Sequence, residues 1–282
     1  MTTSGIVFGA TGRLYRNLAR RAAHTVKHHM PEVKIDLFTG SRPMQDPVFD
    51  RIVHLENAQT TRPKFEALLR SRFDRTLYLD ADIVMCAPVW DLFELLEQFD
   101  IVGGHEQYGS SSAAMRNGPR PLPPAFRQLN SGVLAIRKSD RSQSFLNGWR
   151  DAYVAANARY DQPFMRDQLW QTDLRLWVLP PEYNQMYTPH VLHSSDMHAA
   201  PRLLHLTHLH DDKKFGLPAD RPFDLADLIP GPTHQRLLDL LHSDQSLGNP
   251  PPPAPTLREK LKGKSPSALL ASRLRLLRQR FR

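Results

Sequence analysis

The sequence lacks cysteine pairs, long apolar runs and an N-terminal signal pattern. Of its 282 residues only Cys86 is a cysteine, which excludes an intramolecular disulfide and a cysteine-based zinc site. No uninterrupted apolar run is long enough to cross a bilayer, and Met1–Gly5 has no basic region followed by an apolar core. These absences predict a cytoplasmic protein, in which Cys86 is a buried core residue.

Most of the chain also lacks net charge. The formal net charge is +8, but residues 257–282 hold nine basic residues and one acidic residue, leaving 28 of each in residues 1–256. A neutral body gives no support to nucleic acid as a partner. We expect a folded domain over residues 1–247, a Pro-rich linker over 248–256 and a basic tail over 257–282.

The tail has the pattern of an amphipathic helix. Its apolar residues recur at helical spacing between arginines: Leu270, Leu274, Leu277 and Phe281. This pattern favours a peripheral anchor on an anionic membrane surface, at the inner face of a membrane. A helix that binds a partner or dimerises is the alternative, and the oligomeric state stays open.

Within the body, apolar runs alternate with amphipathic segments, which predicts an α/β fold. Strands are predicted over residues 5–8, 34–38, 50–55, 76–79, 101–104, 133–136, 175–179 and 202–210. Helices are predicted between them, over residues 14–29, 62–72, 92–99, 140–156 and 161–170. In the last strand, alternation places His205 on one face and both His208 and His210 on the other.

Polar clusters follow several of these strands. Asp80-Ala-Asp82 comes directly after the buried strand 76–79, where two carboxylates are placed to share a hard divalent cation with a phosphate. The alternative is that one aspartate caps a turn. If Asp80, Asp82 and His205 converge, two carboxylates and one imidazole favour Mn²⁺ over Mg²⁺.

The turn Gly9-Ala-Thr-Gly12 after the first strand presents free backbone N–H groups, which favours contact with a nucleotide. The same turn permits an NAD(P)-dependent reductase as an alternative, although its third glycine is missing and no Tyr-x-x-x-Lys pair is present. Lys213 or Lys214 could neutralise the phosphates.

The body from Gly5 to Phe215 resembles the GT-A nucleotide-sugar glycosyltransferases. It is most similar to the retaining group that includes the bacterial lipopolysaccharide galactosyltransferases and glycogenin. The matching segments are the Ile6–Phe8 strand with Ala10-Thr11, Leu77–Asp82, Leu129–Val133, Asp161-Gln162, and Leu204-His205 with a downstream lysine.

The resemblance implies a GT-A mixed sheet flanked by helices, and it implies a role for each of several site residues. It implies Mn²⁺ or Mg²⁺ on Asp80, Asp82 and His205. The donor nucleotide would lie against Ala10, Thr11 and Gly12, with Asp80 and Lys213 near its diphosphate. The donor sugar and the acceptor would lie near Asn130, Asp161 and Gln162.

The family's late signature, His-x-x-Gly-x-x-Lys-Pro-Trp, is altered in this chain. His208 replaces the glycine, and Lys213-Lys-Phe215 lacks the Pro-Trp. His208 or His210 therefore stays open as the ligand in place of His205. We expect a metal-dependent transferase that moves a sugar from a UDP-linked donor to a glycan or lipid-linked acceptor, with retention. A non-catalytic GT-A-like binding protein is the remaining alternative.

Overall fold

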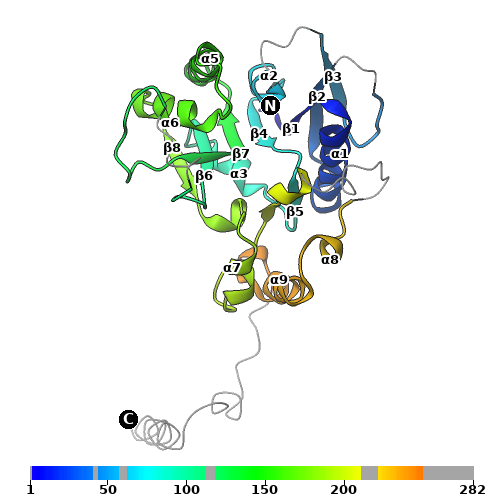
Figure 1. The fold of residues 1–282 in the computed structure, drawn as a ribbon. Coiled ribbons are helices and arrows are strands. Elements are labelled where there is room, and N and C mark those ends of the chain that lie inside the picture. The colour runs from blue at the N-terminus through cyan, green and yellow to red at the C-terminus, as the bar shows by residue number, and fades with distance from the viewer. Residues whose placement is uncertain (1, 41–43, 57–61, 112–117, 211–221, 250–282) are drawn as a thin grey trace, which may run out of the picture.

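Seven strands form one mixed sheet in the order β3-β2-β1-β4-β7-β6-β8 (Figure 1). The computed structural model describes residues 2–40, 44–56, 62–111, 118–210 and 222–249. Most of the predicted linker and the whole of the tail 257–282 lie outside them. The sheet strands are β1 Ser4–Ala10, β2 Lys34–Gly40, β3 Arg51–Leu55, β4 Arg75–Leu79, β6 Ile101–His105, β7 Leu129–Arg137 and β8 Leu176–Leu179.

The strand β7 runs antiparallel to the other strands of the sheet. β1 pairs in parallel with β2 and β4, and β6 pairs in parallel with β8, whereas β7 is antiparallel to both β4 and β6. The first residues of β7 therefore lie beside the last residues of β4, and the backbone N–H of Asp80 donates to the carbonyl of Gly132 at 2.8 Å. This arrangement confirms the predicted mixed sheet and brings Asn130-Ser-Gly132 to the edge where β1 and β4 end.

Helices cover both faces of the sheet, because strand residues alternate between two apolar clusters. Ile6 and Phe8 of β1 pack with α1 on one face, and Val7 packs with α2, α5 and α6 on the other. The helices are α1 Gly12–His29, α2 Pro63–Leu69, α3 Asp91–Leu95, α5 Asp140–Ala155, α6 Gln162–Gln171, α7 Pro189–His193, α8 Leu225–Leu228 and α9 Gly231–Ser243.

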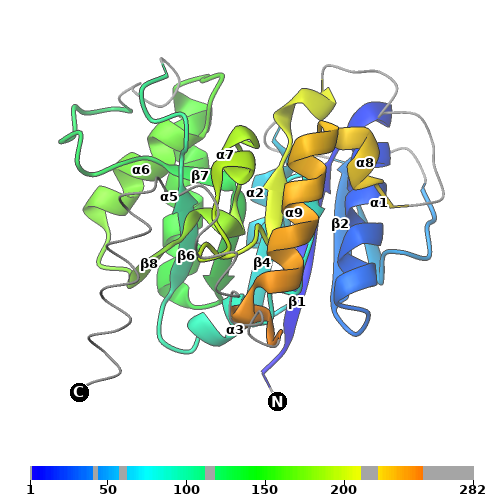
Figure 2. The same ribbon diagram turned by 90° about the horizontal axis from the view of Figure 1, so that it is seen from below.

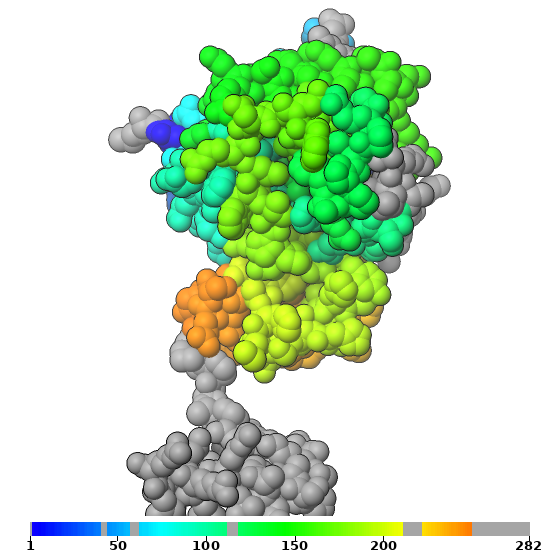
Figure 3. Space-filling model, turned by 90° about the vertical axis from the view of Figure 1, so that its left-hand side faces the viewer, coloured from blue at the N-terminus to red at the C-terminus, as the bar shows by residue number. Residues whose placement is uncertain are grey.

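The helices α7, α8 and α9 gather at one end of the body (Figures 1 and 2). α7 packs against α9, and the space-filling view shows the surface of α9 in orange beside the yellow-green surface of the segment that holds α7 (Figure 3). Among the described residues no helix is both long and apolar enough to cross a bilayer.

Three local predictions were wrong or incomplete. The predicted strand over residues 202–210 is much shorter, since β9 spans Leu203–His205 and a 3₁₀ turn follows over Thr207–His210. The cause is its partner: β9 pairs with β5, Ile83–Met85, which has only three residues and was not predicted. The helix predicted over residues 92–99 is likewise the shorter α3.

Candidate functional site

The two aspartates after β4 occupy different environments. Asp80 is partly accessible, and its Oδ1 accepts a hydrogen bond of 2.6 Å from the hydroxyl of Tyr78. Asp82 is fully buried, and its carbonyl accepts from the N–H of Leu206 at 3.0 Å. This last bond continues the pairing of β5 with β9, which places His205 opposite Ile83 and therefore next to Asp82.

Three of the predicted metal ligands lie together. Asp80, Asp82 and His205 each offer one ligand atom, and these atoms lie within 4.8 Å of one another. Nε2 of His205 is 3.3 Å from Oδ2 of Asp82, and Nε2 of His210 is 3.1 Å from the same oxygen. The exposed His208 has no such contact with Asp82 among the described ion pairs.

These residues fit a divalent cation. Both carboxylate oxygens of Asp82 are buried, and Nε2 of His205 and Nε2 of His210 face Oδ2. Burial raises the pKa of Asp82, but the neighbouring His205 and His210 outweigh burial and hold the pKa well below its usual value. A buried, ionised carboxylate is costly unless a cation or a charged partner compensates it, and Mn²⁺ accepts both carboxylate and imidazole ligands.

A chain of amides orients His205. The Glu106 carboxylate only accepts, so Oε2 takes a hydrogen bond of 2.9 Å from Nδ2 of Asn130. Oδ1 of Asn130 then accepts from Nδ2 of Asn184 at 3.1 Å, and Oδ1 of Asn184 faces Nδ1 of His205 at 3.1 Å. Nδ1 must therefore carry the hydrogen, which leaves Nε2 of His205 directed at Asp82, where it would ligate a metal.

A buried lysine lies behind Asp80. Nζ of Lys64 donates to Oγ of Ser131 at 2.6 Å, and it lies 3.5 Å from Oδ1 of Asp80 and 3.6 Å from Oδ2 of Asp161. Burial raises the pKa of Asp161, but the charges of Lys64 and Arg62 more than offset burial and lower it. Lys64 thus lies between the carboxylates of Asp80 and Asp161 as a cation shared by both.

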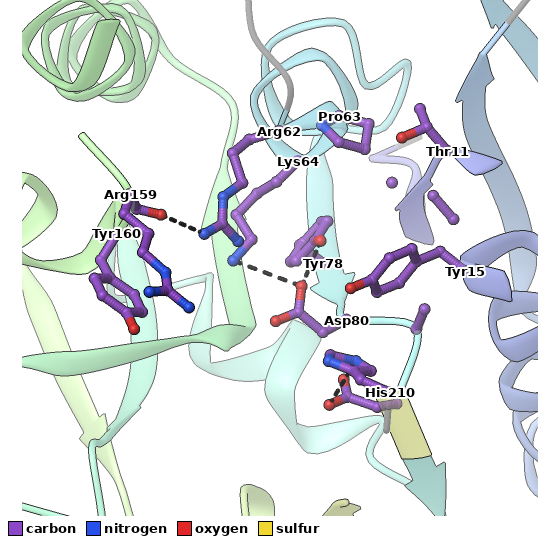
Figure 4. A pocket seen from close by; sticks show the side chains of 14 residues that line it. Thr11, Tyr15, Arg62, Pro63, Lys64, Tyr78, Asp80, Arg159, Tyr160 and His210 are labelled. Carbon is purple, nitrogen blue, oxygen red and sulfur yellow. Dashed lines mark hydrogen bonds and ion pairs between the residues drawn. The ribbon is translucent and has the colours of Figure 1, made fainter. Parts of the chain in front are cut away.

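A cavity of about 420 Å³ opens in front of these groups (Figure 4). Its polar lining comes from elements far apart in the chain: Thr11, Tyr15, Arg62, Lys64, Asp80 and His210. Figure 4 shows Lys64 and Tyr78 directed at Asp80, and His210 near Tyr15. The cavity therefore joins the end of β1 to the residues Asp80 and Asp82 after β4.

The predicted site residues differ in their position relative to the cavity. Ala10, Thr11, Asp80 and Asp82 line the cavity. Asn130, Asp161, Gln162 and His205 are packed around it, with Oε1 of Gln162 accepting from the N–H of Ser131 at 3.2 Å. Gly12 begins α1 with φ of 76° and is not part of the lining. Lys213, with Lys214, lies outside the described residues.

Three residues that contact the site were not predicted from the sequence: Lys64, Glu106 and Asn184. Lys64 carries a usable signal, because it lies four residues before Leu68 on the apolar side of α2. Glu106 follows a strand, as the other site residues do. Asn184 has no local signal, since it acts only through contacts with Asn130 and His205.

Comparisons with known proteins agree with this geometry. The model of the family described as nucleotide-diphospho-sugar transferase matches residues 65–216. No curated protein sequence matches the chain.

Solved structures show the same fold. The galactosyltransferase LgtC, in complex with donor and acceptor sugar analogs, has a TM-score of 0.54 at 14% identity, covering 93% of this chain and 100% of its own. The glycosyltransferase GlyE of Streptococcus pneumoniae TIGR4 has a TM-score of 0.54 at 17% identity, covering 89% of this chain and 66% of its own. The chain thus spans about two thirds of the length of GlyE, and at these identities the likeness concerns the fold.

The family match covers more than half of the chain, and the strand order and cation site are in keeping with it. This chain therefore belongs to the nucleotide-diphospho-sugar transferase family and has the GT-A fold of glycosyltransferases.

Proposed function

We propose that this protein is a metal-dependent glycosyltransferase that moves a sugar from a UDP-linked donor to a glycan or lipid-linked acceptor, with retention of configuration. One observation carries the proposal. Asp80, Asp82 and His205 converge beside a cavity that is also lined by Ala10 and Thr11. A cation held by the first three residues can meet the diphosphate of a nucleotide whose nucleoside lies against the last two.

The metal would be Mn²⁺ or Mg²⁺, held by Asp80, Asp82 and His205. When bound, such an ion supplies Lewis-acid charge to a leaving diphosphate. The chain itself keeps Asp82 ionised, orients His205 through Asn184 and excludes water from the buried side of the site. Lys64 and Arg62 add positive charge to the cavity wall, and Lys213 is proposed as a further diphosphate contact.

The sugar-handling residues would act by position. Asp161 is held by Lys64 and by Ser131, whose hydroxyl donates to Oδ2 of Asp161 at 3.1 Å. Gln162 lies between Ser131 and Glu106, and Nε2 of Gln162 is 3.4 Å from Oε2 of Glu106. We propose that Asp161, Gln162 and Asn130 orient or stabilise the reacting sugar, without a dedicated general base for the acceptor.

The test is a thermal-shift panel of nucleotide sugars with Mn²⁺. A ligand that binds only the folded protein raises its Tm, and about 100 times its Kd gives about 2.7 kcal/mol of stabilisation. We expect one UDP-sugar to raise Tm in the presence of Mn²⁺, and we expect chelator or Asp82→Asn to abolish the rise. Asp196→Asn, an exposed acid on the same protein, is the matched control.

Several outcomes would contradict the proposal. Binding of no nucleotide sugar, or an unchanged shift in Asp82→Asn, would remove its basis. A fluorescence response to NADPH would instead favour the reductase. Donor binding without Mn²⁺-dependent hydrolysis or transfer would indicate a binding protein that kept the fold.

We also propose that residues 257–282 attach the enzyme to the inner face of a membrane that carries its acceptor. The support is the sequence of this segment, which holds nine basic residues, five of them arginines interleaved with apolar residues at helical spacing. Flotation with anionic and neutral liposomes tests this, using the full chain and a chain that lacks residues 257–282. We expect binding only by the full chain and only to anionic liposomes, and equal binding to both would contradict the proposal.

A further inference from the structure

A second histidine contacts Asp82, in addition to the one used above. Nε2 of His210 lies 3.1 Å from Oδ2 of Asp82, slightly closer than Nε2 of His205 at 3.3 Å. Two imidazole nitrogens thus converge on one carboxylate oxygen, and that oxygen is buried.

The backbone places His210 there. Leu206 is bonded to Asp82 through its N–H, and the N–H of Leu209 donates to the carbonyl of Leu206 at 2.9 Å, which closes the 3₁₀ turn. Leu209 is fully buried in the core and anchors the turn, while the rings of Tyr15 and His210 make a T-shaped contact with centroids 5.1 Å apart. The backbone turn and the ring of Tyr15 therefore position the His210 imidazole.

His210 is also open to an entering ion. Its side chain is 34% exposed and lines the cavity, whereas that of His205 is 5% exposed. A residue that only neutralised Asp82 would need no access to the cavity, but a ligand at the mouth of a cation site does.

We propose that His210 is a fourth protein ligand, so that the site holds its metal through two carboxylates and two imidazoles. The inference rests on the metal dependence proposed above and names the class of metal. Imidazole nitrogen suits transition metals, whereas Mg²⁺ prefers oxygen and water. The resident ion is therefore a transition metal such as Mn²⁺, and Mg²⁺ displaces it only in large excess.

The test counts nitrogen ligands on Mn²⁺ by pulsed electron paramagnetic resonance, using the full chain without nucleotide and then with UDP. We expect two coordinated imidazoles in the wild type and in His208→Ala, the control from the same 3₁₀ turn. We expect one in His210→Ala and one in His205→Ala. Mn²⁺ titration should show at least about tenfold weaker binding for His210→Ala, since even outer-shell partners of metal ligands contribute that much.

Failure of this inference is distinct from failure of the proposed function. One imidazole in the wild type, or an unchanged count in His210→Ala, overturns the inference and leaves a transferase with a three-residue site. Two imidazoles in a protein that transfers no sugar confirm His210 and contradict the proposed function. Absence of Mn²⁺ binding with and without UDP overturns both.

Discussion

Nζ of Lys64 lies 3.5 Å from Oδ1 of Asp80, although the two residues belong to different elements, α2 and the end of β4. Gly9 permits this approach: a Cβ at Gly9 would lie 2.7 Å from the backbone nitrogen of Lys64. The close packing of β1 against the first turn of α2 thus delivers a cation to the carboxylates.

Lys64→Met should destabilise the protein. It leaves the buried Asp161 with Arg62 as its remaining cation, at 4.0 Å. Removing one partner of a buried ion pair costs about 3–5 kcal/mol, and we expect about 3 kcal/mol because Arg62 remains. Urea unfolding measures the loss. Lys34→Met, which removes a largely exposed lysine paired with Asp50, should cost less than about 1 kcal/mol. Equal losses in the two variants would contradict this account of Lys64.

Gly132→Ala should weaken metal binding while the protein still folds. A Cβ at this position would lie 2.5 Å from Cε1 of His205 and 2.9 Å from Oδ2 of Asp80. Overpacking of this kind costs about 1–3 kcal/mol, equivalent to a roughly 5- to 150-fold increase in the Kd for Mn²⁺ if the cost falls on the site. Mn²⁺ titration measures it, and Gly231→Ala, where a Cβ meets open space, is the control. If Gly132→Ala bound Mn²⁺ with the affinity of the wild type, the expectation would be contradicted, because the site would then accommodate the added methyl group.

Glu106→Gln should disturb the orientation of His205 from a distance. Oε1 of Glu106 accepts from the N–H of Tyr108, and Oε2 accepts from Asn130 and Gln162. A glutamine here places an amide donor against another donor whichever way it is turned. Loss of such outer-shell bonds typically weakens metal binding 10- to 100-fold, and we expect about tenfold. The matched control is Glu66→Gln, at a partly buried glutamate of α2 that pairs with Arg70, which should bind Mn²⁺ as the wild type does. Unchanged Mn²⁺ affinity in Glu106→Gln would separate Glu106 from the site.

His29 should lower the free energy of unfolding of the protein in mild acid. Burial, together with the adjacent His28, lowers the pKa of His29 from 6.5 to about 4. Between these two pH values the unfolded chain binds a proton that the folded protein does not, so the free energy of unfolding decreases as pH falls from 6.5 to 4.

We expect His29 to contribute about 1–2 kcal/mol to this decrease, after allowance for solvent screening of a partly exposed ring. Urea unfolding of the wild type and of His29→Gln at pH 7 and pH 4 measures the difference in slope. His193→Gln, at an exposed histidine of α7, should keep the wild-type slope. The same slope in all three proteins would contradict the assignment to His29.

The sequence by itself determined those strands and helices that are long enough to show a hydrophobic pattern. β1, β2, β4, β6 and β7 are apolar runs buried on both faces, so their existence and the α/β class follow from periodicity. The Asp80-Ala-Asp82 pair follows one of these strands, which is the basis for the prediction of a cation site there. Most of the site residues predicted with it do lie around the cavity.

The tertiary structure alone decided which side chains surround Asp82. β5 and β9 have three residues each, too few for a periodic signal, and their pairing joins positions more than 100 residues apart. That pairing ends at His205, and the 3₁₀ turn after it returns His210 to the same carboxylate, whereas strand alternation had placed the two histidines on opposite faces. Lys64 and Glu106 also reach the site through contacts between elements, so their local signals in the sequence do not show which residues they contact.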